Sequence, residues 1–511
     1  MSSFLIFQMK SLDNDVLTTL AMLRRHINVL QSPIYRLPSD VFSEVASHLQ
    51  PETDLIRFTH VSYRLRAALL SCPSLWSYID TNYAERAREF LRRSKQAPLC
   101  VNLVKLHDHR EFSLLPSQMA RLVSLEVCNC ASQKESTLSQ PMPALRRLKI
   151  EGATHHDGED DGGAETSPLR SLTSVTSLIV NNTGFVPLRV PYLTHFELRD
   201  LGKVTTIDPL LEFLGNCPLL EDLYISYASE DPNFRDRSVS LPNLRIYQQR
   251  TLSGDYSLRL FNMLSLPPTC SVDIWRVTWP SIVTAVDVVV PPFRNPAYLD
   301  GIVRIKLRTT RNVFLDGTTG TLELINAKGV KVRLRRAVCG SSAEHVIHDE
   351  SDLAHMRCLP DLDTRSVKIL CLEGYRLWDG RGRAVDDVRN AFGCLGSLTT
   401  IILTFTSVKP CLLALDIDPG ADGHLPCSPF VHTLVIHSDY RIDWHDTLQT
   451  LLAVARRRKA AGCPFISVSL FLLDDPQSGP ILDELRGCIE GFEVTVGDKV
   501  LGWNVDEYFL A

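Results

Sequence analysis

A short hydrophobic pattern that recurs along most of the chain is the feature that most limits its fold. Two apolar residues are separated by two positions, and a third follows two positions later. The clearest early copies are Leu122-Leu125-Val127, Leu145-Leu148-Ile150, Val175-Leu178-Val180, Leu193-Phe196-Leu198 and Leu220-Leu223-Ile225, with a degenerate copy at Leu244 and Tyr247. The alternation that ends each copy predicts a strand with one buried face. Its repetition predicts that such strands are stacked side by side.

Later copies of the same pattern are spaced more widely. They are Val367-Leu370-Leu372, Leu398-Ile401-Leu403, Val431-Leu434-Ile436 and Phe465-Val468-Leu470. The central residues of the early copies lie 23, 30, 18 and 27 positions apart, and those of the later copies 31, 33 and 34 positions apart. A helix-like stretch is expected between early copies at residues 208–215. The wider spacing of the later copies indicates longer helical crossovers, which we expect at residues 384–392 and 444–459.

The repeats are similar to leucine-rich repeats, whose period is about 20–29 residues. We therefore predict an α/β fold in which residues 81–511 form an irregular leucine-rich-repeat-like solenoid. A single strand–helix unit cannot bury its apolar face alone, so such units depend on stacking. An ordinary α/β domain without true repeats is the alternative.

Residues 270–335 interrupt the array with a strand-rich segment. Runs that alternate or stay apolar occur at Ser271–Trp275, Val283–Val290, Ile302–Leu307, Thr321–Ile325 and Val330–Leu334. A tight turn at Ala327-Lys328-Gly329 would join the last two. We interpret these strands as inserted in, or bridging, two halves of the array.

Residues 1–32 precede the array, and an amphipathic helix is predicted over residues 11–31. Its apolar residues recur three or four positions apart and therefore share one helix face: Leu12, Val16, Leu20, Leu23, Ile27 and Leu30. Acidic residues near its start and basic residues near its end suit the helix dipole: Asp13, Asp15, Arg24, Arg25 and His26. The apolar face either packs on the chain's own body, which we favour, or mediates self-association.

The sequence of residues 33–80 predicts three short helices. The first starts at Leu37-Pro38-Ser39-Asp40, because proline is tolerated in a first helical turn. Apolar residues at helical spacing then mark the three helices in turn: Val41, Phe42, Val45 and Leu49; Leu55 and Phe58; Val61, Leu65 and Leu69. Cys72-Pro73 ends the last helix, and Leu75-Trp76 comes next. A helical segment of this size buries little apolar area by itself. We therefore expect its apolar faces to contact something else as well.

This segment resembles the F-box. The family pattern reads roughly L-P-x-E-(aliphatic)-(aliphatic)-x-x-I, then a D/E-L step, then V-C-(R/K)-x-W, then a Leu-Trp pair. The matching parts of this chain are Leu37 to Val45, Asp54-Leu55, Val61 to Arg66 and Leu75-Trp76. The continuation from Phe90 to Leu103 resembles the segment after the F-box in proteins of mushroom-forming fungi.

The resemblance implies a substrate-recognition adaptor of an SCF-type cullin–RING E3 ubiquitin ligase. The F-box would dock to a Skp-type adaptor, and through it to a cullin, while the repeats would bind an unknown substrate protein. The side chains expected to contact the Skp-type adaptor are Leu37, Pro38, Val41, Phe42, Val45, Leu55, Val61 and Trp76.

Several positions depart from the family pattern. Asp40 replaces the usual glutamate, and Ala46 stands where a larger apolar residue is common. Ser62, Tyr63 and Leu65 replace the usual cysteine, basic residue and tryptophan. Because aromatic residues often carry interface energy, the change at Leu65 motivates an alternative: a repeat-based interaction scaffold outside any ligase, with a vestigial F-box.

Composition excludes several other classes of protein. The 511 residues include 54 basic and 59 acidic side chains, a net charge of −5, so we expect no nucleic-acid or membrane partner. The 14 cysteines are scattered, with Cys128 and Cys130 as the close pair, which suits reduced thiols in the cytoplasm, the nucleus or both. No run of 18 apolar residues occurs.

Motifs that would indicate catalysis or metal binding are missing from the sequence. No nucleotide-binding glycine pattern, zinc-protease motif or serine-hydrolase motif occurs. The stretch from His155 to Gly163 reads as a solvated loop, and Pro419 breaks the calcium-loop-like series Asp416, Asp418 and Asp422. The basic run Arg456–Lys459 reads as a helix end before Gly462, or else as a nuclear signal. We expect no enzyme, cofactor or metal.

Overall fold

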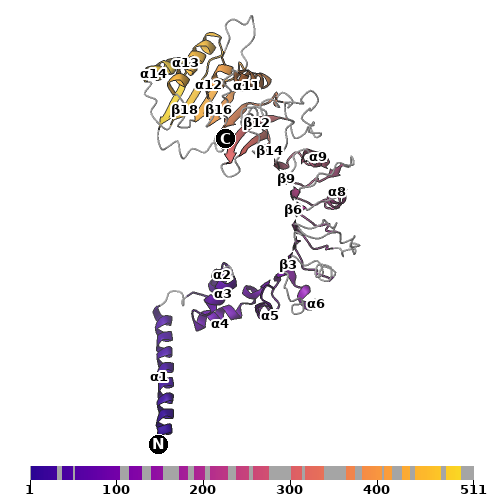
Figure 1. The fold of residues 1–511 in the computed structure, drawn as a ribbon, viewed down its shortest axis with the longest axis vertical. Helices are drawn as coiled ribbons and strands as arrows, with labels where there is room; N and C mark the ends of the chain where they lie inside the picture. Colours follow the sequence, from indigo (N-terminus) through magenta and orange to yellow (C-terminus); the bar gives the residue numbers. More distant parts are fainter. Residues whose placement is uncertain are drawn as a thin grey trace. The chain divides into compact units, whose positions relative to one another are not determined.

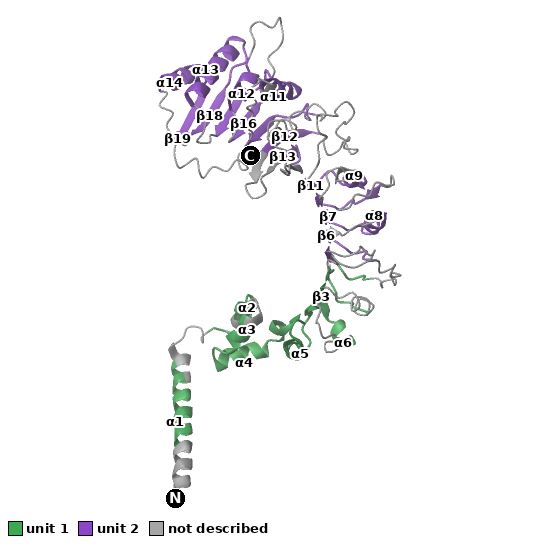
Figure 2. Cartoon of the chain, viewed as in Figure 1, with its two compact units in different colours: residues 1–175 green, residues 176–511 purple. Residues whose placement is uncertain are grey.

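A computed structural model describes most of the chain as two compact units, residues 1–175 and 176–511 (Figure 2). The division falls within the region predicted as one repeat-like domain. The described residues are 2–31, 37–49, 52–103, 114–128, 140–152, 172–181, 189–201, 208–227, 238–251, 257–275, 301–312, 317–338, 359, 364–374, 383–404, 408–416, 428–437, 444–472 and 479–496.

The first unit begins with helices and continues into parallel strands (Figure 1). Its elements are α1 (Ser2–Gln31), α2 (Ser39–Ser47), α3 (Glu52–Thr59), α4 (Tyr63–Ser71), η2 (Pro73–Trp76), β1 (Tyr78–Asp80), α5 (Ala84–Arg93), β2 (Leu99–Leu103), α6 (Pro116–Met119), β3 (Leu122–Cys128) and β4 (Arg147–Glu151). Strands β1 to β4 pair in chain order, each parallel to the next. Among the described helices, none combines the length and the apolar character needed to cross a bilayer.

The second unit starts with a paired series of five strands. Its elements are β5 (Ser177–Asn181), β6 (His195–Leu201), α8 (Asp208–Gly215), β7 (Asp222–Tyr227), β8 (Val239–Ser240), β9 (Ile246–Thr251), α9 (Ser257–Asn262), β10 (Leu264–Ser265), β11 (Ser271–Trp275), β12 (Ile302–Asn312), β13 (Gly317–Asn326), β14 (Lys331–Val338), β15 (Ile369–Glu373), α11 (Arg383–Cys394), β16 (Thr400–Thr404), α12 (Val408–Ala414), β17 (Thr433–His437), α13 (Trp444–Ala460), β18 (Ser467–Leu472), α14 (Gly479–Cys488) and β19 (Gly491–Val496).

Parallel pairing dominates this second unit. Strands β5, β6, β7, β9 and β11 pair in that order, and β15 to β19 pair in chain order. Strands β8 and β10 form a separate parallel pair. The predicted α/β class, with a mostly parallel sheet, is therefore confirmed.

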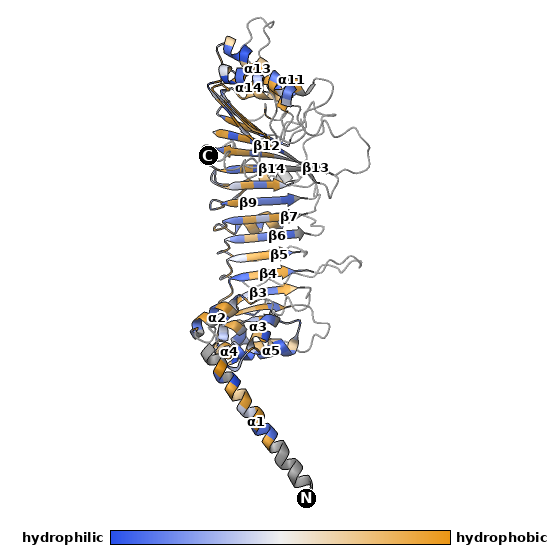
Figure 3. Ribbon diagram, turned by 90° about the vertical axis from the view of Figure 1, so that its left-hand side faces the viewer, coloured by the Kyte–Doolittle hydropathy of each residue, from blue (hydrophilic) through white to orange (hydrophobic). Residues whose placement is uncertain are grey.

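The predicted repeats are confirmed in register. Leu125 lies opposite Leu148 in the first unit, and Phe196 lies opposite both Leu178 and Leu223 in the second. The central residues of the later copies form a second aligned row: Leu370, Ile401, Leu434 and Val468. All these side chains are buried. Figure 3 shows the resulting alternation of apolar and polar residues along strands such as β4 and β6.

Several copies contain one more buried position than the sequence pattern predicted. The first residue of a copy donates its N–H to the carbonyl three residues earlier, as Leu193 does to Val190 and Leu220 to Cys217. Residues at this extra position are buried: Met142, Leu172, Val190, Cys217, Leu241 and Leu395. Proline follows four of them, at positions 143, 191, 218 and 242. Proline fixes φ near the value that a turn requires. These four prolines therefore mark the turn in the sequence.

The degenerate copy at Leu244 and Tyr247 contains a hydrogen bond between two buried polar side chains. Tyr247 lies opposite Leu223 and is fully buried. Gln249 is also fully buried at the position where other copies have an apolar residue, and its Oε1 accepts a hydrogen bond from the Tyr247 hydroxyl. This hydrogen bond satisfies the buried oxygen of Gln249, while its Nε2 is buried without a hydrogen-bond partner.

The strand-rich segment connects two groups of parallel strands. Strands β12, β13 and β14 form an antiparallel meander, in which β14 pairs with β11 and β12 pairs with β15. The predicted turn is confirmed: Asn326 Oδ1 accepts hydrogen bonds from the N–H groups of Lys328 and Val330, and Gly329 has φ of +77°. The bridging interpretation is therefore confirmed, although the predicted strand Val283–Val290 lies outside the described residues.

The crossover helices lie close to their predicted ranges, as α8, α11 and α13. Helices α11 to α14 lie along one face of strands β15 to β19 (Figure 1). The opposite face of β15, β16 and β17 is also buried, because Cys371, Ile402 and Val435 are fully buried in an apolar cluster with Ile325. Burial on both faces explains the nearly continuous apolar runs of β15, β16 and β17.

The basic run at the end of α13 is engaged in structural contacts. Arg456 pairs with Glu484, and Arg457 pairs with Asp416. Arg458 is fully buried and donates to the carbonyls of Leu415, Ser428 and Val431, the last at 2.8 Å. Gly462 follows with φ of +77°, which confirms the predicted helix end.

Replacing Arg458 by alanine is expected to lower the free energy of unfolding by about 3 kcal/mol or more. The loss would leave three buried carbonyl groups without this donor, and each unsatisfied group costs about 1–3 kcal/mol. Urea denaturation measures the change. The matched control is Arg457→Ala, which removes a half-exposed ion pair worth less than about 1 kcal/mol. Equal effects of the two substitutions would contradict the structural role of Arg458.

Candidate functional site

The helical segment at residues 37–80 has a closed core of its own. Buried side chains from α2, α3, α4 and η2 meet there: Ala46, Leu55, Leu65, Leu69 and Trp76. The side chain of Ser62 caps α4, since its Oγ accepts a hydrogen bond from the Leu65 N–H at 3.2 Å. Such a cap satisfies one of the N–H groups that a helix start leaves without a partner.

Trp76 joins this helical core to α5. Its indole Nε1 donates to the Leu69 carbonyl at 2.9 Å, and its ring meets Phe90 edge-on with centroids 4.9 Å apart. The Arg93 guanidinium lies 4.4 Å from the ring centroid. Trp76 is fully buried, so a polar partner for its N–H is what burial of an indole requires.

The structure divides the eight expected adaptor contacts into two groups. Leu55 and Trp76 are buried and hold the segment together. Val41, Val45 and Val61 are 38%, 46% and 67% exposed. Pro38 is also exposed, and Leu37 is partly buried. Phe42 lies in α2, but its side chain is outside the described part of the structure. The exposed valines are therefore the available contact residues, and the two buried residues support them.

Two of the five departures from the F-box pattern lie inside the core, and the other three are exposed or half-buried. Leu65 is 1% exposed and Ala46 is 2% exposed, so both replace core residues. Tyr63, in contrast, is 67% exposed. Leu65 therefore belongs to the core of this segment and not to its exposed surface.

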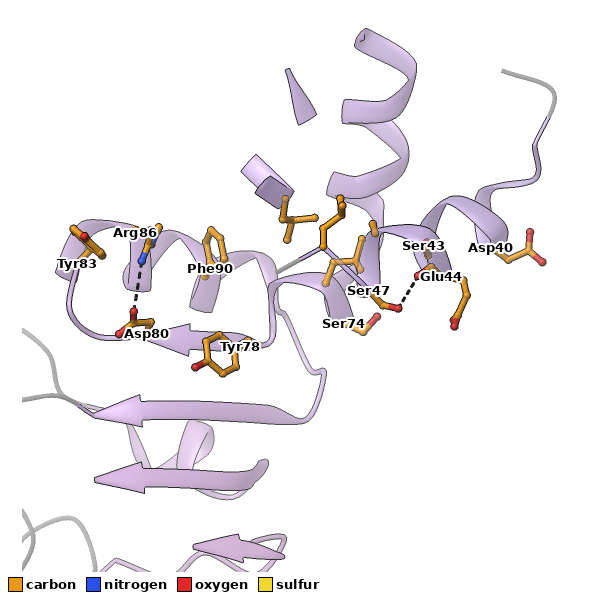
Figure 4. A pocket seen from close by; sticks show the side chains of 14 residues that line it. Asp40, Ser43, Glu44, Ser47, Ser74, Tyr78, Asp80, Tyr83, Arg86 and Phe90 are labelled. Carbon is orange, nitrogen blue, oxygen red and sulfur yellow. Dashed lines mark hydrogen bonds and ion pairs between the residues drawn. The ribbon is translucent and has the colours of Figure 1, made fainter. Parts of the chain in front are cut away.

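A groove of about 860 Å³ lies beside α2 within the first unit (Figure 4). Its floor is apolar, and three carboxylates and one guanidinium stand around it, with Arg86 3.7 Å from Asp80. The lining residues are Asp40, Ser43, Glu44, Ala46, Ser47, Leu49, Leu55, Ser74, Leu75, Tyr78, Asp80, Tyr83, Arg86 and Phe90. With 100° per residue, Val41 and Val45 lie on a different face of α2 from Asp40, Ser43 and Ser47.

A charged cluster lies on the open face of strands β3 and β4. Glu126, Cys128 and Glu151 place possible ligand atoms within 4.8 Å of one another. The Lys149 Nζ is 2.5 Å from Glu126 and 3.7 Å from Glu151, so its ammonium already supplies a positive charge there. Burial, together with Glu151 and Glu126, raises the pKa of the Cys128 thiol to about 12. The arrangement is that of an ion-paired cluster around a protonated thiol.

Exposed aromatic and cationic side chains gather on strands β6, β7, β9 and β11 of the second unit. The Arg199 guanidinium lies 5.7 Å from the Tyr224 ring centroid, and that of Arg250 lies 5.6 Å from the Trp275 ring centroid. Ile246 is 42% exposed and Trp275 36% exposed. We call these five residues the open-face patch. The sequence pattern missed them, because they occupy the variable positions between buried residues.

Two other predicted features lie wholly or partly outside the described residues. The stretch from His155 to Gly163 is one of them, and so are Asp418 and Asp422. Asp416 is described and pairs with Arg457, with Nε and Oδ1 2.6 Å apart. This carboxylate therefore has a structural partner.

Comparison with known proteins adds no assignment, because no family model and no curated protein matches this chain.

Replacing Trp76 by alanine is expected to destabilise the first unit by about 3–5 kcal/mol, as for other buried aromatic side chains. Trp76→Phe keeps an aromatic ring but removes the N–H, so it should cost about 1–3 kcal/mol. Urea denaturation measures both values. Val61→Ala is the matched control, because an exposed side chain changes stability by about 0.5 kcal/mol or less. A Trp76→Ala effect as small as the control would contradict the proposed core.

Cys128 is expected to react slowly with iodoacetamide at pH 8. With a pKa of about 12, only about one ten-thousandth of the thiol is ionised at that pH, and the thiolate is the reactive form. Cys72 is the comparison, because hydrogen bonds from Ser43 and Ser74 outweigh its burial and lower its pKa. Mass spectrometry of labelled peptides should show Cys72 ahead of Cys128 in the native protein, and equal labelling after denaturation.

Proposed function

We propose that this protein is the substrate-recognition adaptor of an SCF-type cullin–RING E3 ubiquitin ligase. Its F-box-like segment docks to a Skp-type adaptor, and its leucine-rich-repeat-like solenoid binds the substrate protein. The chain itself performs no bond chemistry. Its contribution is proximity, because holding a substrate lysine near a ubiquitin-loaded enzyme raises the effective concentration of the two reactants.

One observation carries the proposal. The residues that match the F-box pattern include a complete core, yet the pattern's valines Val41, Val45 and Val61 remain exposed. Val41 and Val45 are four residues apart on α2 and therefore share a face. Apolar side chains of this kind stabilise a complex when a partner covers them. Because Leu65 is buried, its departure from the pattern leaves this docking face intact.

The open-face patch is the substrate-binding surface in this proposal. Tyrosine, tryptophan and arginine are the residues that most often dominate interface energies, and the patch contains Tyr224, Trp275, Arg199 and Arg250. Strands β15 to β17 offer no such surface on the same side, since Cys371 and its neighbours are buried there. Arg250 favours a substrate segment that presents a carboxylate beside apolar side chains, whereas Arg199 is already paired with Glu197.

The alternative function is a repeat-based scaffold that works outside any ligase. The same open-face patch supports it, because a protein-binding surface there does not require a docked Skp-type adaptor. The difference lies in the helical segment, which would then be a structural cap without a partner. Adaptor binding therefore decides between the two functions.

Co-purification with a Skp-type adaptor tests the proposal. The wild-type chain is expected to bind, and Val41→Asp with Val45→Asp should weaken binding at least about 100-fold, because two charges would enter an apolar contact. Leu37→Ala with Pro38→Ala should also abolish binding. Circular dichroism checks that each variant keeps its helices.

A variant of the open-face patch, Arg250→Ala with Trp275→Ala, is the matched control. It should bind the Skp-type adaptor as the wild type does, but lose partners that proximity labelling finds in cells. A wild-type chain that fails to bind any Skp-type adaptor would favour the scaffold function. Loss of adaptor binding in the patch variant would contradict the division into two surfaces.

A further inference from the structure

Helix α1 presents an apolar face that its own chain leaves uncovered. Leu12, Val16, Leu20, Leu23 and Ile27 are 67%, 51%, 46%, 57% and 42% exposed. We expected this face to pack on the chain's own body, but all side chains described between residues 12 and 27 are exposed. The helix runs on through thirty residues, about 45 Å, so its apolar face extends beyond the reach of the short helices that come after it.

The stretch from residue 12 to residue 27 has a largely symmetric order. Most of its apolar residues stand at equal distances from the midpoint, and acidic residues on one side correspond to basic residues on the other. At the centre the symmetry is broken, because Leu20 and Ala21 correspond to Thr19 and Thr18. The corresponding pairs are Leu12 with Ile27, Asp13 with His26, Asp15 with Arg24, Val16 with Leu23 and Leu17 with Met22. Such an order is what an antiparallel contact between two identical helices requires.

Helix geometry places these pairs on the correct faces. At 100° per residue, Leu12, Val16, Leu23 and Ile27 all project within about 30° of one direction. Thr18 and Ala21 project about 150° away from that direction. Leu12, Val16, Leu23 and Ile27 therefore form one straight stripe, centred on the midpoint of the stretch. Leu17 and Met22 lie outside this stripe and project about 110° to either side of it.

We propose that this stripe is a homodimer contact in which α1 pairs antiparallel with α1 of a second copy of this chain. A two-fold axis through the midpoint would place Leu12 against the partner's Ile27 and Val16 against the partner's Leu23. Self-complementary patches of this kind are how two-fold dimers are built.

Charge selects the antiparallel direction. An antiparallel partner brings its Arg24 and His26 beside Asp13 and Asp15, so opposite charges meet at both ends of the contact. A parallel partner would instead set Asp13 and Asp15 against the same two carboxylates. Among the described residues, the structure gives Asp13, Asp15 and Arg24 no ion pair within the chain, so these charges are available to a second copy.

The dimer is independent of the proposed ligase function, because it uses a surface of α1 that neither docking face includes. If the protein is an adaptor, however, the homodimer would present two substrate sites and two docking segments in one complex. Two linked sites bind a multivalent substrate more tightly than either site alone.

The first test compares the mass of the full-length chain in solution with that of α1 variants. Sedimentation velocity should give twice the 57.4 kDa of one chain. Val16→Glu with Leu23→Glu should raise the dimer dissociation constant at least about 100-fold, because four apolar side chains leave each contact. The matched control, Thr18→Glu with Ala21→Glu, adds the same charges to the outer side of α1 and should remain dimeric.

The second test determines the direction of pairing. Asp13→Lys with Asp15→Lys should weaken the dimer about tenfold, because like charges then meet. Adding Arg24→Glu and His26→Glu to the same chain should restore the wild-type affinity, since both ends of an antiparallel contact are then reversed together.

Three results would overturn the proposal. One is a wild-type chain that stays monomeric up to about 50 μM, a concentration well above the dissociation constants of stable dimers. Another is a dimer that the Val16→Glu and Leu23→Glu variant leaves unchanged, since the contact would then lie elsewhere. The last is a fourfold charge reversal that fails to restore a dimer weakened by the first two lysines, which would exclude the antiparallel direction.

Discussion

The parallel register of neighbouring strands is the constraint on which the rest of this structure depends. Leu178, Phe196 and Leu223 lie in one row, and Leu370, Ile401 and Leu434 lie in another. A shift by one residue would turn each row to the opposite face. Because no strand can bury its central residue alone, each copy of the repeat requires its neighbours, and the loops between copies can vary in length without loss of the core.

Burial of the two sheet faces differs along the strands of the second unit. Strands β6, β7, β9 and β11 bury one face. Their other face is accessible to solvent and carries Tyr224, Arg250 and Trp275. Strands β15 to β17 bury both faces, as Ile402 and Val435 show. The meander β12–β14 lies where the two kinds of strand meet, because β14 pairs with β11 and β12 pairs with β15.

The helical segment at residues 37–80 combines a core with an exposed apolar face. Trp76 closes the core through the Leu69 carbonyl and the Phe90 ring, while Val41 and Val45 remain outside it. The core and the exposed apolar face of this segment are thus built from different residues. Helix α1 adds a second exposed apolar face, whose symmetric order of charges suits another copy of itself.

Periodicity in the sequence determined the strands, their register and the crossover helices, because apolar spacing reports directly which face of an element is buried. It also determined the turn at Gly329 and the helix end before Gly462. Tertiary structure alone decided which residues of the F-box-like motif are core and which are surface, since Trp76 and Val61 are both apolar in the pattern but opposite in burial. The open-face patch likewise required the fold, because strand pairing brings together Arg199, Tyr224, Arg250 and Trp275 from four separate strands. Residues that gather only through pairing leave no local signal in the sequence.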